Sequence, residues 1–141
     1  MNVLLSIKPK YANQILKGNK RYEFRKSVFK NRDLDMVYIY SSSPVKRILG
    51  AFSIKKIIEK HPEQLWDECK DFSGIDEEDF FDYFRGKEKG FAIEIGEVKT
   101  FNPINPKDHI HDFIPPQSFC YTNKHWAGVV LMDNEIPGDI K

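Results

Sequence analysis

Cysteine is scarce in this chain, and long apolar runs are missing from it. Only two of the 141 residues are cysteines, Cys69 and Cys120, which is too few for a disulfide framework and lacks the spacing of metal ligands. The apolar start, residues 3 to 7, is far shorter than the roughly 18 to 20 residues of a membrane span and too short for a signal sequence. We therefore expect a cytoplasmic protein with no membrane association.

A metal site is not expected either. His109 and His111 would share one face of a strand, but no third ligand stands at a suitable spacing, so we interpret them as a surface pair. No motif calls for a cofactor. The length suits one domain, residues 1–141, that buries about two thirds of its unfolded surface and folds alone. We expect a monomer or a weak dimer.

The net charge of +1 hides a division between the two halves of the chain. Residues 1 to 60 carry 14 Lys and Arg against 4 acids, and residues 61 to 141 carry 8 against 17. A clustered positive surface attracts phosphate-bearing ligands, so the basic half favours an anionic partner. The alternative is that the two halves neutralise each other in the folded protein.

Alternation of apolar and polar residues predicts an α+β fold of short strands with helices in the connections. Residues 36 to 40 are apolar on both faces, as in a central strand that is covered on both sides. Gly50 and the pair Lys55-Lys56 interrupt the alternation of the next strand and predict a bulge. The expected strands are 3 to 7, 20 to 26, 36 to 40, 49 to 58, 89 to 101 and 117 to 121, with an irregular loop at 102 to 116 and a last apolar run at 128 to 132.

Proline, aspartate and glycine mark the expected helices. Pro9 opens a first helix that ends at Gly18, since proline suits the first turn and glycine the residue after the last turn. Pro62 opens a second helix, and Asp76 and Gly86 begin and end a third. The second and third helices form an insert at about 61–88 with ten acids and three bases, so its outer surface is not expected to bind phosphate. The tail, about 134–141, is expected to fray.

A short charged run follows the first helix. Gly18 precedes Lys20, Glu23 and Arg25 at offsets of two, five and seven, where the helix gives way to a strand. Glu23 and Arg25 are two apart and should project from the same face of that strand, whereas Lys20 can reach them only from the turn or across a bulge. Such charges could be no more than surface ion pairs worth about 0 to 1 kcal/mol each. Alternatively, the arginine fork would hold a phosphate or a base edge, and a desolvated lysine could act as a nucleophile or base.

The run resembles the G-x-K-x-x-E-x-R signature of ASCH domains, which belong to the PUA-like superfamily of RNA-associated β-barrels. The segments LLSIKPKYANQILKGNKRYEFRK and YFRGKEKGFAIEIGEV, and Ser43-Pro44 followed by Gly50, resemble further parts of this family. The resemblance implies a PUA-like, small and partly closed β-barrel of mixed strands with peripheral short helices. It also implies a cleft into which the signature side chains point, and a role in binding RNA or a nucleobase-containing ligand.

Some members of this family resemble small amidohydrolases that act on acylated cytidine with the signature lysine as nucleophile or base, and others are described as ribonucleases. In the amidohydrolases a threonine stands three residues after the lysine, whereas this chain has Glu23. An ionised carboxylate cannot donate the hydrogen bond that a hydroxyl can. The amidohydrolase mechanism therefore does not transfer directly to this sequence.

Several further side chains are candidates for a ligand cleft. Serine and glutamine can read a base edge, tyrosine can stack on a base, and lysine and arginine can hold phosphate. For each of them the alternative is a capped turn or a place in the core. Together with the signature residues, the predicted ligand-binding set is Lys8, Lys20, Glu23, Arg25, Tyr40, Ser41, Ser42, Arg47, Gln117 and Tyr121.

The leading hypothesis is an RNA- or nucleotide-binding module with a basic cleft, which could serve regulation of transcription or translation. The rival is a small hydrolase, either an amidohydrolase on a modified nucleobase or a ribonuclease, with Lys20 and Glu23 as its catalytic residues. A third class is an adaptor that uses the acidic helices to meet a protein partner. The first two share the expectation that RNA, a nucleotide or a nucleobase occupies the cleft.

Overall fold

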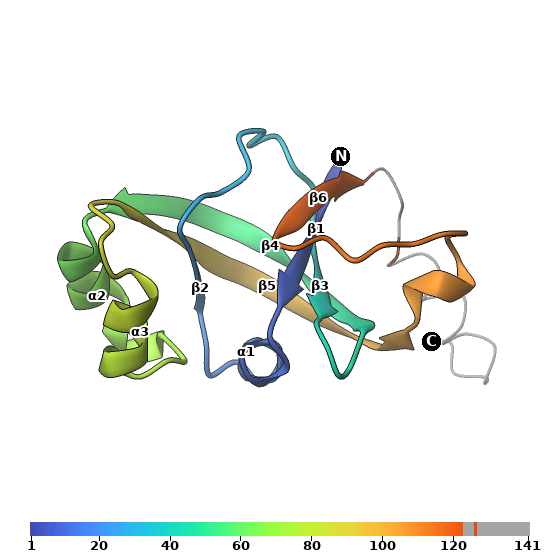
Figure 1. Ribbon diagram of the computed structural model, residues 1–141, viewed down its shortest axis with the longest axis horizontal. Coiled ribbons are helices and arrows are strands. Elements are labelled where there is room, and N and C mark those ends of the chain that lie inside the picture. The colour runs from blue at the N-terminus through green and yellow to red at the C-terminus, as the bar shows by residue number, and fades with distance from the viewer. Residues whose placement is uncertain (123–125, 127–141) are drawn as a thin grey trace.

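A curved sheet of six strands forms the body of the protein. The computed structural model describes residues 1–122 and 126, so the run at 128 to 132 and the tail at 134–141 lie outside the described residues. The strands follow the order β2-β5-β4-β3-β1-β6. Only β1 and β3 are parallel, and every other pair is antiparallel. The prediction of an α+β fold with a small, partly closed β-barrel of mixed strands and short peripheral helices is confirmed, and the sheet forms a half-barrel (Figure 1).

The order of elements matches the sequence pattern closely. Predicted boundaries shift by a few residues, and no expected strand or helix of the described part of the chain is missing. The elements are β1 (Asn2–Ile7), α1 (Pro9–Leu16), β2 (Tyr22–Arg25), β3 (Val37–Ser41), β4 (Arg47–Lys60), α2 (Pro62–Cys69), the 3-10 turn η1 (Lys70–Phe72), α3 (Glu77–Tyr83), β5 (Gly90–Ile104), the 3-10 turn η2 (Pro106–Asp108) and β6 (Phe119–Thr122).

Turn and cap chemistry places the helices as expected. Pro9 and Pro62 begin α1 and α2, and the Asp76 carboxylate accepts a hydrogen bond from the Asp79 N–H at the start of α3. Gly18 and Gly86 follow α1 and α3 with φ angles of 82° and 77°, which glycine adopts without the steric cost that other residues meet. The charged run of the signature therefore begins at a true helix end.

The two long strands, β4 and β5, pair along most of their length and carry the bend of the sheet. Their register shifts near Gly50 and between Phe52 and Lys56, which confirms the predicted bulge. β5 extends through Pro103 to Ile104, three residues beyond the prediction. Because β2 pairs only with residues 91 to 94 of β5, one edge of β5 carries no partner strand near Pro103, and an unpaired edge is where a strand tolerates proline.

Both faces of the sheet are covered. Every residue of β3 is buried, as predicted for a central strand. One core lies between the sheet and α1, and a second lies on the opposite face around Tyr38 and Trp126. A third core joins Tyr22 and Phe24 of β2 to the aromatic side of α2 and α3. Figure 1 shows these two helices at one end of the long strands, so the insert extends the barrel at the end where β2 lies. Among the described residues, no helix is long and apolar enough to cross a membrane.

Candidate functional site

A cleft of about 980 Å³ opens where α1, β2, α3 and the segment before β6 approach one another. Its floor comes from the ends of β1 and β3, and the insert supplies one of its walls. The residues that line it are Ser6, Ile7, Lys8, Tyr11, Glu23, Arg25, Lys26, Ser27, Tyr40, Ser42, Ser43, Lys46, Ile75, Asp79, Tyr83, Pro115, Pro116, Gln117 and Ser118. The cleft thus joins side chains from both ends of the sequence.

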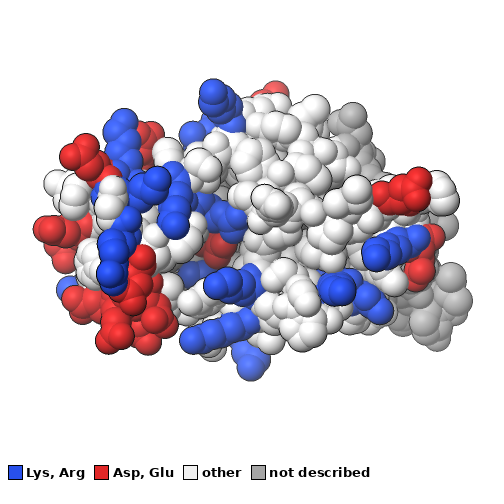
Figure 2. Space-filling view, in the orientation of Figure 1, with Lys and Arg blue, Asp and Glu red and all other residues white. Residues whose placement is uncertain are grey.

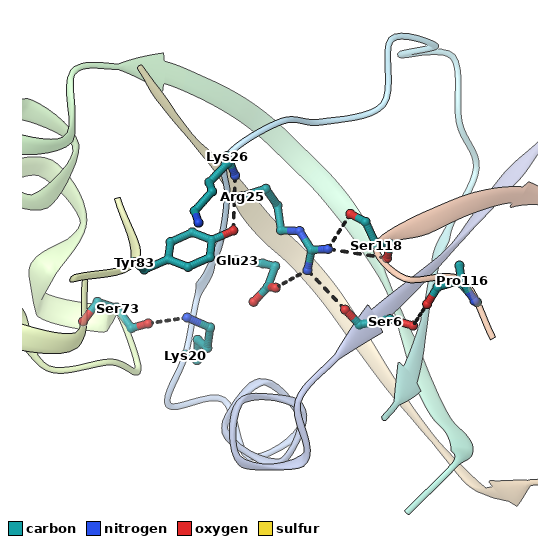
Figure 3. Close-up of polar contacts among 9 residues, drawn as sticks. All are labelled: Ser6, Lys20, Glu23, Arg25, Lys26, Ser73, Tyr83, Pro116 and Ser118. Atoms are coloured by element: carbon teal, nitrogen blue, oxygen red, sulfur yellow. Dashed lines mark hydrogen bonds and ion pairs between the residues drawn. The ribbon is translucent and has the colours of Figure 1, made fainter. Parts of the chain in front are cut away.

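Arg25 is the centre of the hydrogen-bond network in this cleft (Figure 3). Its Nη1 donates to Glu23 Oε2 at 2.9 Å and to the Ser6 carbonyl at 3.2 Å. Its Nη2 donates to Ser118 Oγ at 2.8 Å and to the Ser118 carbonyl at 3.4 Å. The planar fork of a guanidinium can serve several acceptors at once in a fixed geometry. Arg25 therefore links β2, β1 and the segment before β6.

Glu23 and Arg25 project from the same side of β2, as strand alternation predicts. Their side chains are only 7% and 13% exposed, and they form an ion pair at 2.9 Å. Such a pair differs from a surface ion pair, because removal of one partner would leave a largely buried charge unpaired. The pair gives the cleft a rigid acceptor beside a rigid donor. The amino group of a base could donate to the carboxylate, and the positive charge of Arg25 would attract a phosphate.

Lys20 lies behind the cleft rather than in it. Lys20 is 3% exposed, and its Nζ donates a hydrogen bond to the Ser73 carbonyl at 2.6 Å. Nζ also lies 4.7 Å from the ring centre of Phe24 and 5.1 Å from that of Tyr11. Burial lowers the pKa of Lys20 to about 8, while Glu23 and Cys69 act in the opposite direction. Lys20 is absent from the lining of the cleft, and its amine is directed at the insert (Figure 3).

Three tyrosines contribute aromatic surface and hydroxyls to the cleft. Burial raises the pKa of Tyr11, Tyr40 and Tyr83, so each keeps its proton at neutral pH. Asp79, Asp76 and Glu23 raise the pKa of Tyr11 further. The Tyr83 hydroxyl accepts a hydrogen bond from the Lys26 N–H at 3.2 Å, and Lys26 Nζ lies 4.7 Å from its ring centre. This contact joins α3 to the end of β2 at the rim of the cleft.

The structure brings together six of the ten predicted ligand-binding residues in the lining of the cleft: Lys8, Glu23, Arg25, Tyr40, Ser42 and Gln117. Lys20 lies beneath it. Ser41 is fully buried in β3. The Arg47 side chain donates to the Lys46 carbonyl. Tyr121 lies on the outer strand β6, and its hydroxyl accepts a hydrogen bond from the Asn31 N–H. The last three side chains lie away from the cleft lining.

Other lining residues were not expected from the sequence. Lys46 takes the place envisaged for Arg47 because its backbone has a φ of 56° and turns the chain at this point. No sequence motif marked Ser6, Tyr11 or Ser118 as a ligand-binding residue. Ser6 lies next to the last residue of β1. Asp79 and Tyr83 reach the cleft because α3 packs beside β2. The acidic insert is thus part of the wall, an arrangement that its charge alone did not suggest.

The cleft has cationic and anionic parts. Lys8, Lys26, Lys46 and Arg25 supply positive charge, and Glu23 and Asp79 supply negative charge. Figure 2 shows acidic side chains gathered at the end of the molecule formed by α2 and α3, with basic side chains on the adjoining surface. Ion pairs such as Lys60 with Glu68 join the two halves of the sequence, so their charges are in part neutralised in the folded protein. Phosphates would meet the cationic part, and amino groups of a base would meet the carboxylates.

The histidine pair has no metal-binding surroundings within residues 1–122. His111 Nε2 contacts the Asp112 carboxylate at 3.3 Å, and the His109 ring packs against Trp126. No group of three or more histidine, cysteine, aspartate and glutamate side chains is arranged to hold a metal ion in the part of the chain that the structure describes.

The fold and the signature define a class of protein. The family model for the ASCH domain matches residues 5–105 of the chain, which is more than half of its length. The protein belongs to the ASCH domain family, and its half-barrel is the PUA-like fold of that family. Relatives of known name add to this assignment.

The chain is 29% identical over 124 residues to a protein of Zymomonas mobilis named "ASCH domain-containing ribonuclease", an alignment that covers 86% of this chain and 84% of the relative. It is also 27% identical over 107 residues to the large ribosomal subunit protein uL22 of Ureaplasma parvum, covering 75% of this chain but only 33% of that protein.

Crystal structures of the ASCH protein from Zymomonas mobilis superpose on most of the chain. One, described by that name, has a TM-score of 0.83 and 27% identity, covering 94% of each chain. A tyrosine-to-phenylalanine variant of the same protein has a TM-score of 0.84 and 25% identity, covering 93% of this chain and 96% of that one.

Proposed function

We propose that this protein binds single-stranded RNA or a nucleotide in the cleft around Arg25. The observation that carries the proposal is the fixed guanidinium of Arg25, which lies in a concave site beside Glu23 and is flanked by rim lysines. Both Nη atoms of Arg25 already donate to Glu23, Ser6 and Ser118, so the guanidinium would act as a fixed positive charge that attracts phosphate, and direct contacts to the phosphate would come from the lysines beside it. Binding of this kind would also suit a regulatory role in transcription or translation.

The chemistry of the cleft lining supports a nucleotide more than a peptide or a lipid. Lys8 and Lys46 stand at the rim, where they could contact successive phosphates, and the exposed Tyr83 offers a ring on which a base could stack. Ser42 and Gln117 supply neutral donors and acceptors for a base edge. The volume of about 980 Å³ is at the upper end of small-molecule sites, which leaves room for more than one nucleotide.

Cleavage of RNA is a second candidate function, favoured by the likeness to a protein named ribonuclease. Attack of a ribose 2′-hydroxyl on the adjacent phosphate needs a base and a cation near the developing charge. Glu23 would accept the hydroxyl proton, and Arg25 with a rim lysine would stabilise the phosphate oxygens. The hydroxyl of Tyr40, which burial keeps protonated, would serve as a donor to the leaving oxygen.

The amidohydrolase mechanism fits this geometry less well. A lysine nucleophile or base must reach the reacting atom of the substrate. Lys20 Nζ is buried against the Ser73 carbonyl and two aromatic rings. An attack by this amine on a ligand in the cleft would first require it to leave the Ser73 carbonyl and its buried site. The proposed nucleic-acid functions need no such movement.

The experiment uses a fluorescein-labelled single-stranded RNA octamer and the same octamer with 2′-deoxyribose throughout. Fluorescence anisotropy measures binding at several salt concentrations, and denaturing gels measure cleavage. Binding that weakens with salt supports the proposal, because phosphate contacts release counterions. Cleavage of the RNA but not of the deoxy octamer supports the ribonuclease function, and binding without cleavage assigns a binding module. Absence of binding to both probes at low salt would overturn the proposal that the cleft binds a nucleic-acid strand.

A further inference from the structure

Of the three charged signature residues, Lys20 is the one that does not line the cleft. Glu23 and Arg25 line the cleft, whereas the buried amine of Lys20 donates to the Ser73 carbonyl of the insert (Figure 3). A lysine that is 3% exposed and directed at a backbone carbonyl holds two parts of the chain together.

The segment that Lys20 contacts is the link between η1 and α3. Nζ donates to the Ser73 carbonyl at 2.6 Å, and the neighbouring Arg21 N–H donates to the Phe72 carbonyl at 2.8 Å. The turn itself is closed by Ser73 Oγ, which donates to the Ile75 carbonyl at 2.7 Å. Residues 72 to 75 therefore lie directly against the chain that leads into β2.

Gly74 allows this close approach. It has a φ of 67°, and a Cβ placed on it would lie 2.5 to 2.8 Å from the Cβ, Cγ and Cδ atoms of Lys20. No real Cβ atom comes so near to other carbon atoms. The stem of Lys20 thus packs against the bare backbone of Gly74, while its amine holds the carbonyl one residue earlier. The two contacts fix the turn at two adjacent points.

The wall of the cleft begins at the next residue. Ile75, Asp79 and Tyr83 line the cleft, and all three follow the turn that Lys20 holds. Beyond this turn the insert reaches the rim through the Tyr83 hydroxyl and Lys26. A shift of the turn at Ser73 would therefore move Asp79 and Tyr83 relative to Glu23 and Arg25. The width of the cleft depends on this anchor.

We propose that Lys20 is a positioning residue that holds the insert as one wall of the ligand cleft, and that it does not react with the ligand. The structural part of the inference concerns the free protein. The part that concerns affinity rests on the proposed binding of RNA. The two parts are therefore tested by separate measurements.

Three variants of the full chain test the inference. Lys20→Met removes the amine but keeps an unbranched stem. Gly74→Ala keeps the lysine and its amine, but the added methyl group would push the Lys20 side chain out of its contact with the turn. Gly86→Ala is the matched control, because Gly86 also has a positive φ, of 77°, and belongs to the same insert, but a Cβ placed on it would meet no atom within 4 Å.

Amide hydrogen exchange of the ligand-free proteins is the first measurement. Lys20→Met and Gly74→Ala are expected to speed exchange in residues 72 to 84 about tenfold, the effect of one buried hydrogen-bond partner left unmade, with the amides of β3 unchanged. Gly86→Ala should leave residues 72 to 75 at the wild-type rate. Wild-type exchange at residues 72 to 75 in Gly74→Ala would overturn the inference, and so would faster exchange spread evenly over the whole chain. If Lys20→Met fails to fold, Gly74→Ala decides the outcome.

Affinity for the labelled RNA octamer is the second measurement. Lys20→Met and Gly74→Ala should weaken binding by similar factors, and Gly86→Ala should not. A lysine that reacts with its ligand predicts a different result: turnover lost in Lys20→Met with affinity and exchange unchanged, and turnover kept in Gly74→Ala. That result would overturn the inference. If the wild-type protein binds no RNA, the proposed function fails, while the exchange measurement still decides the role of Lys20.

Discussion

Arg25 and Ser118 stand 93 positions apart in the chain and meet across the cleft. The guanidinium Nη2 donates to the Ser118 hydroxyl at 2.8 Å and to its carbonyl at 3.4 Å. The same guanidinium binds Glu23 on its own strand. A second link, from Ser6 Oγ to the Pro116 carbonyl at 2.7 Å, holds the same segment against β1. The segment before β6 is thus fastened to the signature strand at one side of the ligand site.

Replacement of Arg25 by lysine should damage both stability and binding. A lysine ammonium cannot reproduce the planar fork that serves Glu23, Ser6 and Ser118 together. We expect Arg25→Lys to lower the free energy of unfolding by about 1 to 3 kcal/mol, measured by urea denaturation. Arg32→Lys, at an exposed position, is the control and should change it by less than about 0.5 kcal/mol. Equal stability of Arg25→Lys and the wild type would show that the network carries no energy.

The buried Lys20 should give the protein a distinct stability profile at alkaline pH. Its pKa falls from 10.5 to about 8 on folding, so the unfolded chain binds more protons than the folded protein between these values. Stability attributable to Lys20 therefore rises as the pH increases through this window. We expect the stability of the wild type relative to Lys20→Met to increase by about 2 kcal/mol between pH 8 and pH 10.

This pH effect has to be measured as a difference between the two proteins. The pKa of Cys69 is raised to about 12 by burial, so the wild type and Lys20→Met both lose stability above about pH 9 from that thiol. The loss largely cancels in the difference. A stability difference that stays constant from pH 8 to pH 10 would mean that Lys20 titrates alike in the folded and unfolded chain.

Gly50 should be among the least replaceable residues of the sheet. A Cβ on Gly50 would collide with the Lys99 carbonyl oxygen of the paired strand, and it would lie 2.9 Å from a methyl of Leu16. We expect Gly50→Ala to cost about 3 kcal/mol or more of unfolding free energy, because backbone atoms cannot give way easily. Gly96→Ala is the comparison, since its Cβ would lie nearest the Ser53 hydroxyl, which can rotate at the loss of one hydrogen bond from the Glu97 N–H, and the Ser53 carbonyl oxygen is 3.2 Å away. A smaller loss in Gly50→Ala than in Gly96→Ala would contradict this account.

Each rim lysine should contribute to the salt dependence of RNA binding. A contact between lysine and phosphate releases counterions from a single strand, so the slope of log Kd against log salt should fall by about 0.7 when one such contact is lost. We expect this change in Lys8→Gln and in Lys46→Gln. Titrations at four salt concentrations measure the slope. Unchanged slopes in both variants would show that these lysines do not contact phosphate.

The sequence could predict most of the fold because its signals are local. Alternation placed the strands, proline and glycine placed the helix ends, and the interrupted pattern at Gly50 placed the bulge. The boundary of β5 was missed at Pro103, because only the sheet order shows that one edge of the strand carries no partner strand there. Alternation and the placement of proline and glycine depend only on residues that are close in the sequence. They carry no information on which edge of a strand is covered by another strand.

The site could be predicted only in part for the same reason. Glu23 and Arg25 share a face by strand geometry alone. The positions of Ser118 and Tyr83 depend on contacts with residues far away in the chain, Arg25 and Lys26. The burial of Lys20 depends on the backbone of Gly74, 54 positions later. No spacing rule connects such residues.

The central claim is that RNA binds in the cleft around Arg25 rather than on basic surface in general. The most direct test compares two double variants that remove the same charge. Lys8→Gln with Lys46→Gln removes two cations of the cleft, and Lys55→Gln with Lys56→Gln removes two exposed cations of β4 outside it. Affinity for the labelled RNA octamer is measured by anisotropy at one low salt concentration. We predict that the cleft pair weakens binding about tenfold or more, and that the β4 pair changes it less than about twofold. Equal losses in the two pairs, or a larger loss in the β4 pair, would contradict the account.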